Sequence, residues 1–163
     1  MAANVRFHNP NTLAPQSGYS YVVDTTGPGR TVYIAGQLGL DMENKLVGAP
    51  GDFRAQCTKA IENLQAALAS VGAKLTDVVK ITNYLTDMSS HIGIYREVRD
   101  QFFPMPRPAS TAVGISQLAR PGALFEIEAI AVLPAAKGSA SAKARAPKRA
   151  AKAKAKAGRR KRK

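Results

Sequence analysis

The sequence predicts an α+β fold of order β-β-α-β-α-β-β, a mixed sheet with two helices on one face, followed by a separate basic tail. Two segments have apolar residues three and four positions apart, as amphipathic helices do. The segments around them are short and rich in β-branched and aromatic residues. After residue 134 the composition changes abruptly to Ala, Lys, Arg, Gly, Ser and Pro. We therefore expect a folded domain over residues 1–134 and a disordered tail over residues 135–163.

The domain is predicted to begin with a β-hairpin. Residues 19–24 and 31–35 are β-branched and aromatic runs, and the turn-forming residues 25–30 separate them. Residues 1–18 are rich in Pro, Asn, Gly and Ser, and we expect them to form an irregular lead-in.

The first helix is predicted over residues 53–71, where apolar side chains form a single stripe. Asp52 is the expected N-cap, and Gly72 is the expected C-terminal stop. Cys57 lies on the stripe, without a helix N-terminus or basic setting that would lower the pKa of its thiol. It is therefore expected to be buried and unreactive.

The second half of the domain is predicted to contain a strand, a helix and two further strands, over residues 76–86, 90–103, 110–115 and 124–133. Prolines that follow the helix end it. Two amphipathic helices can cover only one face of the sheet. We expect another subunit on the other face, because the last strand is apolar on both sides apart from two carboxylates. A solvated face is the alternative.

The net charge of +13 belongs to the tail, because residues 137–163 contain 13 Lys and Arg and no acidic residue. A single cysteine excludes an intramolecular disulfide framework and fits a reducing compartment. The chain starts without a secretory signal pattern, and no apolar run approaches the roughly 20 residues that span a membrane. We therefore expect a cytoplasmic protein without membrane contact, with nucleoid association as an option.

Four blocks of sequence, residues 34–37, 79–87, 107–115 and 125–132, together resemble the RidA/YjgF family of reactive-intermediate deaminases. They occur in the right order and in one register over about residues 5–134. The resemblance implies a chorismate mutase-like fold and a homotrimer with a barrel-like core of sheets. It also implies three clefts between subunits, in which a hydrolase converts a small imine or enamine metabolite to ammonia and a 2-oxo acid.

One position departs from the family's motif. In active members the motif reads Arg-Pro-Ala-Arg, and its second arginine binds the substrate carboxylate; here Ser110 stands in its place. Serine offers one short hydroxyl instead of a charged, bidentate fork. Because a hydrogen bond to a charged group contributes about 1.5–3 kcal/mol, losing two weakens substrate binding by roughly two to four orders of magnitude.

Arg107 keeps the first arginine of the motif. Three positions from Ser110 on an extended strand, it points to the opposite face, so it is not a simple substitute. It is expected either to contact the ligand or to form a salt bridge at the subunit interface.

Glu126 matches the family's carboxylate near the cleft and is the candidate catalytic base that positions and polarises the attacking water. It is two residues from Glu128, so both point to the same face of a strand, roughly 7 Å apart. The alternative for both is an ion pair between subunits.

Three further residues are candidates for substrate binding. Tyr19 matches an aromatic residue of the cleft wall, with a core or rim position as its alternative. Gly36 ends a strand, where a backbone N–H can approach a ligand closely, and a simple bend is its alternative. Thr111 is placed in the site by the resemblance.

No metal or cofactor is expected. His8 and His91 have no cysteine or carboxylate partner at ligand spacing. The sequence also has no phosphate loop, nucleotide fingerprint or nucleophile elbow.

The tail is predicted to bind DNA or RNA, and it resembles the basic tails of linker-histone-like and nucleoid-associated proteins. It has no aromatic or β-branched residue, so it cannot bury enough apolar surface to fold. Neutralisation of phosphates makes such binding non-specific and steeply salt-dependent. A solubilising tail without a defined partner is the alternative. The residues expected to contact nucleic acid are Lys152, Lys154, Lys156, Arg159, Arg160, Lys161, Arg162 and Lys163.

These observations leave three functional hypotheses. The first is a RidA-like hydrolase of C=N or related bonds. The second is a catalytically altered or inactive trimeric scaffold that brings three basic tails to nucleic acid. The third is the nuclease or translation-inhibiting activity associated with some relatives, although no residue pair here indicates a site that cleaves phosphodiesters.

Overall fold

The computed structural model of the protein describes residues 4–15 and 18–135, so the nucleic-acid residues predicted in the tail lie outside the described residues. In the described part, no helix is long and apolar enough to cross a membrane. The elements in chain order are β1 (Asn4–His8), β2 (Val22–Thr26), β3 (Gly29–Leu38), α1 (Phe53–Ala69), the short 3-10 helix η1 (Leu75–Asp77), β4 (Val78–Leu85), α2 (Met88–Phe102), β5 (Ala109–Gly114) and β6 (Phe125–Pro134).

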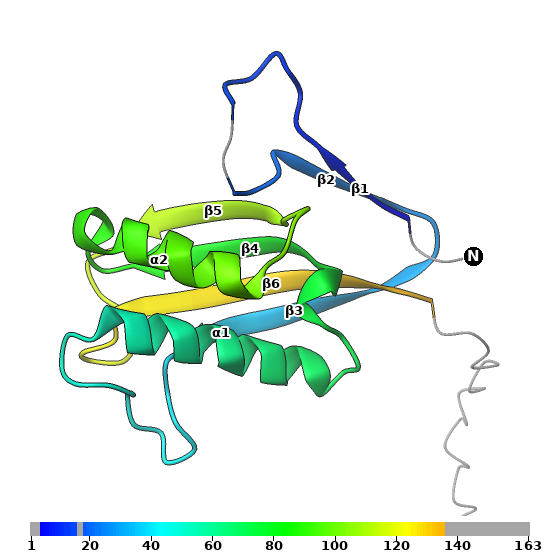
Figure 1. Cartoon of the computed structure of the whole chain (residues 1–163). Coiled ribbons are helices and arrows are strands. Elements are labelled where there is room, and N and C mark those ends of the chain that lie inside the picture. The colour runs from blue at the N-terminus through cyan, green and yellow to red at the C-terminus, as the bar shows by residue number, and fades with distance from the viewer. Residues whose placement is uncertain (1–3, 16–17, 136–163) are drawn as a thin grey trace, which may run out of the picture.

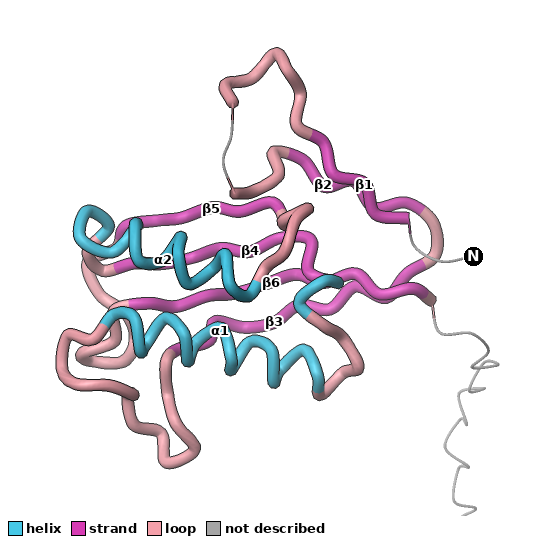
Figure 2. The backbone as a smooth tube through the Cα atoms, viewed as in Figure 1, coloured by secondary structure: helices cyan, strands magenta, loops and turns pink. Residues whose placement is uncertain are grey.

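A mixed four-stranded sheet in the order β3-β6-β4-β5 forms the centre of the domain. β4 and β5 are parallel, with α2 between them in sequence, and β6 is antiparallel to both of its neighbours. Both helices lie on the same face of the sheet (Figure 1). The tube view in Figure 2 shows the same arrangement and the long loops at the ends of the strands. The predicted α+β fold, with two helices on one face of a mixed sheet, is therefore confirmed.

The core lies between the helices and the sheet, and β6 shows how it forms. Phe125, Ile127 and Ala129 are buried in the core, whereas the residues between them are only half-buried on the other face. Cys57 on α1 is fully buried, as predicted, and burial raises the pKa of its thiol to about 12. Such a thiol stays protonated at neutral pH and is a poor nucleophile.

The predicted hairpin between residues 19–24 and 31–35 is wrong. β2 pairs with β1, which lies in the stretch expected to be irregular, and β3 pairs with β6 instead. β2 and β3 diverge from the turn that joins them, as Figure 1 shows. β1 alternates between exposed and half-buried residues, but five residues are a weak period-two signal beside the Pro- and Asn-rich sequence that follows.

Aspartate caps set where both helices begin. Asp52 Oδ1 accepts a hydrogen bond from the N–H of Ala55 at 2.9 Å, as predicted. Asp87 Oδ1 accepts one from the N–H of Ser90 at 3.1 Å, which starts α2 two residues before the predicted position. Hydrogen bonds from Ser90 hold the pKa of Asp87 at about 2. Gly72, with φ of 75°, follows the end of α1 in a left-handed conformation.

We predict that Asp52→Ala lowers the free energy of unfolding by about 1 kcal/mol, because the cap hydrogen bond at the start of α1 is lost. Gln65→Ala, an exposed mid-helix change, is the matched control and should alter stability by no more than about 0.5 kcal/mol. Urea unfolding of both variants measures the difference. Equal stabilities would contradict the assigned cap.

Candidate functional site

The predicted site residues lie near two opposite edges of the sheet. Gly36 is on the edge strand β3 with Glu126 on the adjacent strand β6, whereas Ser110 and Thr111 are on the other edge strand, β5. With strands about 4.8 Å apart, the two edges are separated by roughly 14 Å. One chain therefore does not bring all the predicted residues together.

At the first edge, the carboxylate of Glu126 rests against the backbone of Gly36. A Cβ atom at position 36 would lie only 1.6 Å from Glu126 Oε1, so any larger residue there would displace the carboxylate from this position. The pairing of β3 with β6 shifts between Ile34 and Gln37. Such bulges are over-represented beside active sites, where they re-aim a side chain.

Glu126 shares the face of the sheet opposite the helices with Glu128, Tyr84 and Lys80. Burial raises the pKa of Glu126, and the charge of Glu128 raises it further. Burial also raises the pKa of Tyr84, which stands opposite Glu126 in the sheet, and both glutamates add to that increase. Burial lowers the pKa of Lys80, and the charge of Glu128 partly offsets this effect. The charge of Glu128 therefore influences the pKa of all three neighbouring groups.

The same face has a hollow of about 630 Å³. Lys80, which lines it, donates a hydrogen bond from Nζ to Thr111 Oγ1 at 2.7 Å. Thr111 therefore faces this side of the sheet, away from the helices. The hollow is lined by Tyr33, Ile34, Ala35, Lys80, Thr82, Glu128, Ala129 and Ile130.

At the second edge, the segment before β2 is attached to the start of β5. The N–H of Ser20 donates to the carbonyl oxygen of Pro108 at 3.2 Å, and Ser20 Oγ donates to the carbonyl oxygen of Arg107 at 2.7 Å. These bonds hold Tyr19 near β5, where its ring meets the ring of Tyr21 edge-on at 5.4 Å between centroids. Within one chain, Tyr19 therefore lies at the same edge of the sheet as Ser110 and not beside Glu126.

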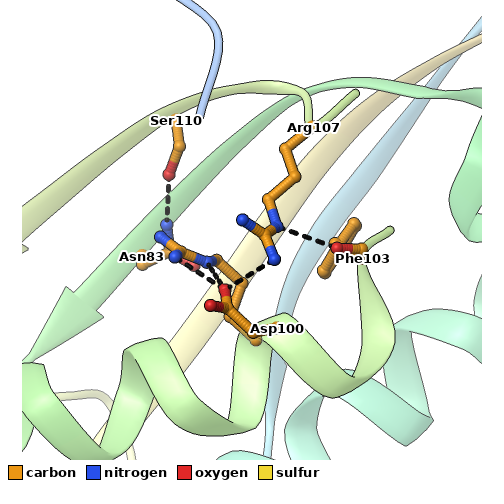
Figure 3. Close-up of polar contacts among 6 residues, drawn as sticks. Asn83, Asp100, Phe103, Arg107 and Ser110 are labelled. Carbon is orange, nitrogen blue, oxygen red and sulfur yellow. Dashed lines mark hydrogen bonds and ion pairs between the residues drawn. The ribbon is translucent and has the colours of Figure 1, made fainter. Parts of the chain in front are cut away.

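Ser110 faces the helix side of the sheet. Asn83, which is fully buried, donates from Nδ2 to Ser110 Oγ at 3.2 Å and to the carbonyl oxygen of Thr111 at 3.0 Å (Figure 3). Among the described residues, Asn83 Oδ1 and the buried Tyr95 hydroxyl have no hydrogen-bond partner. The surroundings of Ser110 are therefore polar and incompletely satisfied, which is costly inside a protein.

Arg107 is engaged within its own chain. Its Nε donates to the carbonyl oxygen of Phe103 at 2.9 Å, and its Nη2 is 3.1 Å from Asp100 Oδ1 (Figure 3). The same carboxylate oxygen accepts hydrogen bonds from Arg99 Nε and Nη2, at 2.9 Å and 2.7 Å. Two arginines thus share one acidic partner next to the start of β5.

Sequence reasoning missed Lys80, Tyr84 and Arg99, although each had a signal. Lys80 and Tyr84 alternate with the buried positions of β4, so they share the face of Glu126. Arg99 is four residues after Tyr95 and three before Phe102, on the apolar stripe predicted for the second helix. A cation on such a stripe indicates a buried, partnered charge.

Comparisons with known proteins agree with this architecture. The profile of the family described as "Endoribonuclease L-PSP" matches residues 9–133. The chain is 36% identical to a 2-iminobutanoate/2-iminopropanoate deaminase of Dermatophagoides farinae over 74% of this chain and 91% of that protein. It is 38% identical to the mouse (Mus musculus) protein of the same name, over 81% of this chain and 95% of the relative.

A solved structure shows the same fold. The Rid-family protein YyfB from Yersinia pestis, described as of unknown function, is 32% identical in sequence and superposes with a TM-score of 0.72. The match covers 78% of this chain and 98% of that one.

We predict that Glu128→Gln lowers the pKa of Glu126, because the neighbouring negative charge is removed while burial remains. A ¹³C NMR titration of the glutamate carboxyl groups measures the change. Glu43→Gln, at an exposed position, is the control and should leave the pKa of Glu126 unaltered. An unchanged or increased pKa of Glu126 in Glu128→Gln would show that the two carboxylates are not coupled.

Proposed function

The chain belongs to the endoribonuclease L-PSP family, which includes the RidA/YjgF proteins, and on this premise we propose that it hydrolyses small 2-imino acids to 2-oxo acids and ammonia. Enamines that tautomerise to these imines are substrates by the same route. One water adds across the C=N bond, and the resulting carbinolamine loses ammonia. The names of the two curated relatives support this substrate class.

The contact between Glu126 and Gly36 carries the proposal. Glu126 accepts a proton from the attacking water, and its raised pKa makes it a better base than an ordinary exposed glutamate. Gly36 leaves room for the carboxylate and brings a strand backbone beside it. Glu126 returns that proton to the nitrogen, which gives the carbinolamine. The carboxylate then moves the proton of the carbinolamine hydroxyl to the same nitrogen as the C=O bond forms and the C–N bond breaks, so that ammonia departs and the carboxylate is regenerated.

The proposed working form is a homotrimer. Glu126 lies near one edge of the sheet, and Tyr19 and Ser110 lie at the other, so a cleft containing all three needs two copies of the chain. A closed head-to-tail ring joins the β3 edge of each copy to the β5 edge of the next. It also offers a way to cover the half-buried sheet face that the helices leave open.

A second candidate function rests on the charge of residues 137–163, which lie outside the described residues. Their 13 basic side chains neutralise nucleic-acid phosphates, and three copies per trimer increase the avidity. Here the chain is a scaffold with altered or lost catalysis, and Ser110 is the residue that favours it. The two functions are compatible in one molecule.

We predict that the full-length protein accelerates ammonia release from freshly generated 2-iminobutanoate, and that Glu126→Gln lowers kcat by about 10²–10⁴. Glu43→Gln, an exposed substitution, should retain the wild-type rate. A coupled assay for ammonia gives both values. If the wild-type protein releases ammonia no faster than buffer alone does, the proposed enzymatic function is wrong.

We also predict that DNA retardation at low salt requires the tail and weakens steeply as salt increases. Full-length protein and a variant ending at residue 136 are compared by gel shift between about 50 and 200 mM salt. Equal retardation by both proteins would show that the tail is not the nucleic-acid-binding element.

A further inference from the structure

Arg99 is a charged side chain buried on α2, and its place in the fold points to a ligand. Only 7% of the side chain is exposed. A buried guanidinium is costly unless it is paired, so its contacts indicate why it is there.

The guanidinium of Arg99 lies between Gly18 and Tyr95. A Cβ atom on Gly18 would be 2.2 Å from Arg99 Nη2 and 2.9 Å from Cζ, so a glycine is needed for this approach. On the other side, Cζ is 5.6 Å from the centre of the Tyr95 ring, within the range of a cation–π contact. Gly18 directly precedes Tyr19, the candidate cleft residue at this edge.

Arg99 is also close to position 110, where Ser110 replaces the second arginine of the family's motif. Its neighbour Gly18 lies two residues before Ser20, and Ser20 forms a bridge with Ala109, the residue before Ser110. The guanidinium therefore reaches the neighbourhood of Ser110 from the helix rather than from the strand.

The charge at this edge is not balanced. Arg99 and Arg107 both pair with Asp100 Oδ1; Figure 3 shows the pair with Arg107. Two positive charges thus share one negative charge, and among the described residues Arg99 donates to Asp100 from Nε and Nη2 but not from Nη1. Asp100 is 46% exposed, so the shared carboxylate borders solvent, where a second carboxylate can join or replace it.

We propose that Arg99, assisted by Arg107, binds the carboxylate of the 2-imino acid in place of the arginine that Ser110 lacks. This inference rests on the proposed function and names the cation on which that function depends. The substrate class is a small anion with a carboxylate next to the C=N carbon. Its neutral amide would bind poorly.

The test measures binding of 2-oxobutanoate, the product of 2-iminobutanoate hydrolysis, and of its neutral amide to the full-length protein by calorimetry. Arg99→Met is expected to weaken 2-oxobutanoate binding at least tenfold, on the order of one charge-assisted hydrogen bond, and to leave the weak amide binding unchanged. Arg96→Met, an exposed cation on the same helix, is the matched control and should bind as wild type does. Adding Ser110→Arg to Arg99→Met should restore carboxylate binding, since Asn83 Oδ1 lies free beside position 110 among the described residues.

Folding is monitored by thermal unfolding. If Arg99→Met does not fold, ¹⁵N-labelled arginine in the wild-type protein replaces it, with the Arg99 Nε signal assigned from Arg99→Lys. A shift of that signal on adding 2-oxobutanoate supports the proposal, and shifts confined to other arginines overturn it.

The experiments distinguish failure of the proposed role of Arg99 from failure of the proposed function. If wild type hydrolyses 2-iminobutanoate and Arg99→Met binds 2-oxobutanoate equally well, only the role of Arg99 is overturned. If wild type neither hydrolyses the imine nor binds 2-oxobutanoate, the proposed function is overturned, and the role of Arg99 is overturned with it.

Discussion

The alternation of side chains along β6 is the constraint on which the rest of the structure depends. Because successive residues of a strand point to opposite faces, this one central strand supplies both the core and the candidate site. Phe125 and Ile127 pack under the helices, while Glu126 and Glu128 face away from them. A shift of one residue in the register would exchange the two sets and bury both carboxylates in the core. The pairing of β6 with β3 also places Glu126, the candidate base, next to the β3 edge of the sheet.

Much of the fold can be predicted from local sequence patterns, without knowing which strands pair with which. The stripe that includes Cys57 and the cap at Asp52 define α1, and period-two alternation with a parallel crossover defines β4, α2 and β5. The pairing of the first strands could not be inferred in the same way. A strand next to a turn suggests a hairpin, but β2 pairs with β1, which precedes it, and not with β3, which pairs with the distant strand β6.

The candidate site shows the same limit. The shared face of Glu126 and Glu128 follows from spacing, whereas Gly36, predicted to end a strand, lies within β3, and its contact with Glu126 was not predicted. Arg99 was missed, because its place on an apolar helix stripe indicates a buried charge but not which groups surround it. Its role depends on Gly18 and Tyr95, which meet only in the folded chain. The local sequence indicates which residues have side chains that can bind substrate or transfer protons, and the tertiary fold determines which of them lie close together.

The central claim is that a working site takes its base from one copy of the chain and its carboxylate-binding cation from another, because these lie toward opposite edges of one sheet. Mixing subunits tests this claim most directly. Glu126→Gln and Arg99→Met are each expected to be impaired, the first in kcat and the second in substrate binding. They are unfolded together, refolded as a mixture and assayed for imine hydrolysis at a substrate concentration at which each variant alone is far slower than wild type. In a head-to-tail ring with random mixing, about a quarter of the clefts combine an intact Glu126 from one copy with an intact Arg99 from the next. The account predicts recovery of about a quarter of the wild-type rate, and a mixture no more active than either variant alone would contradict it.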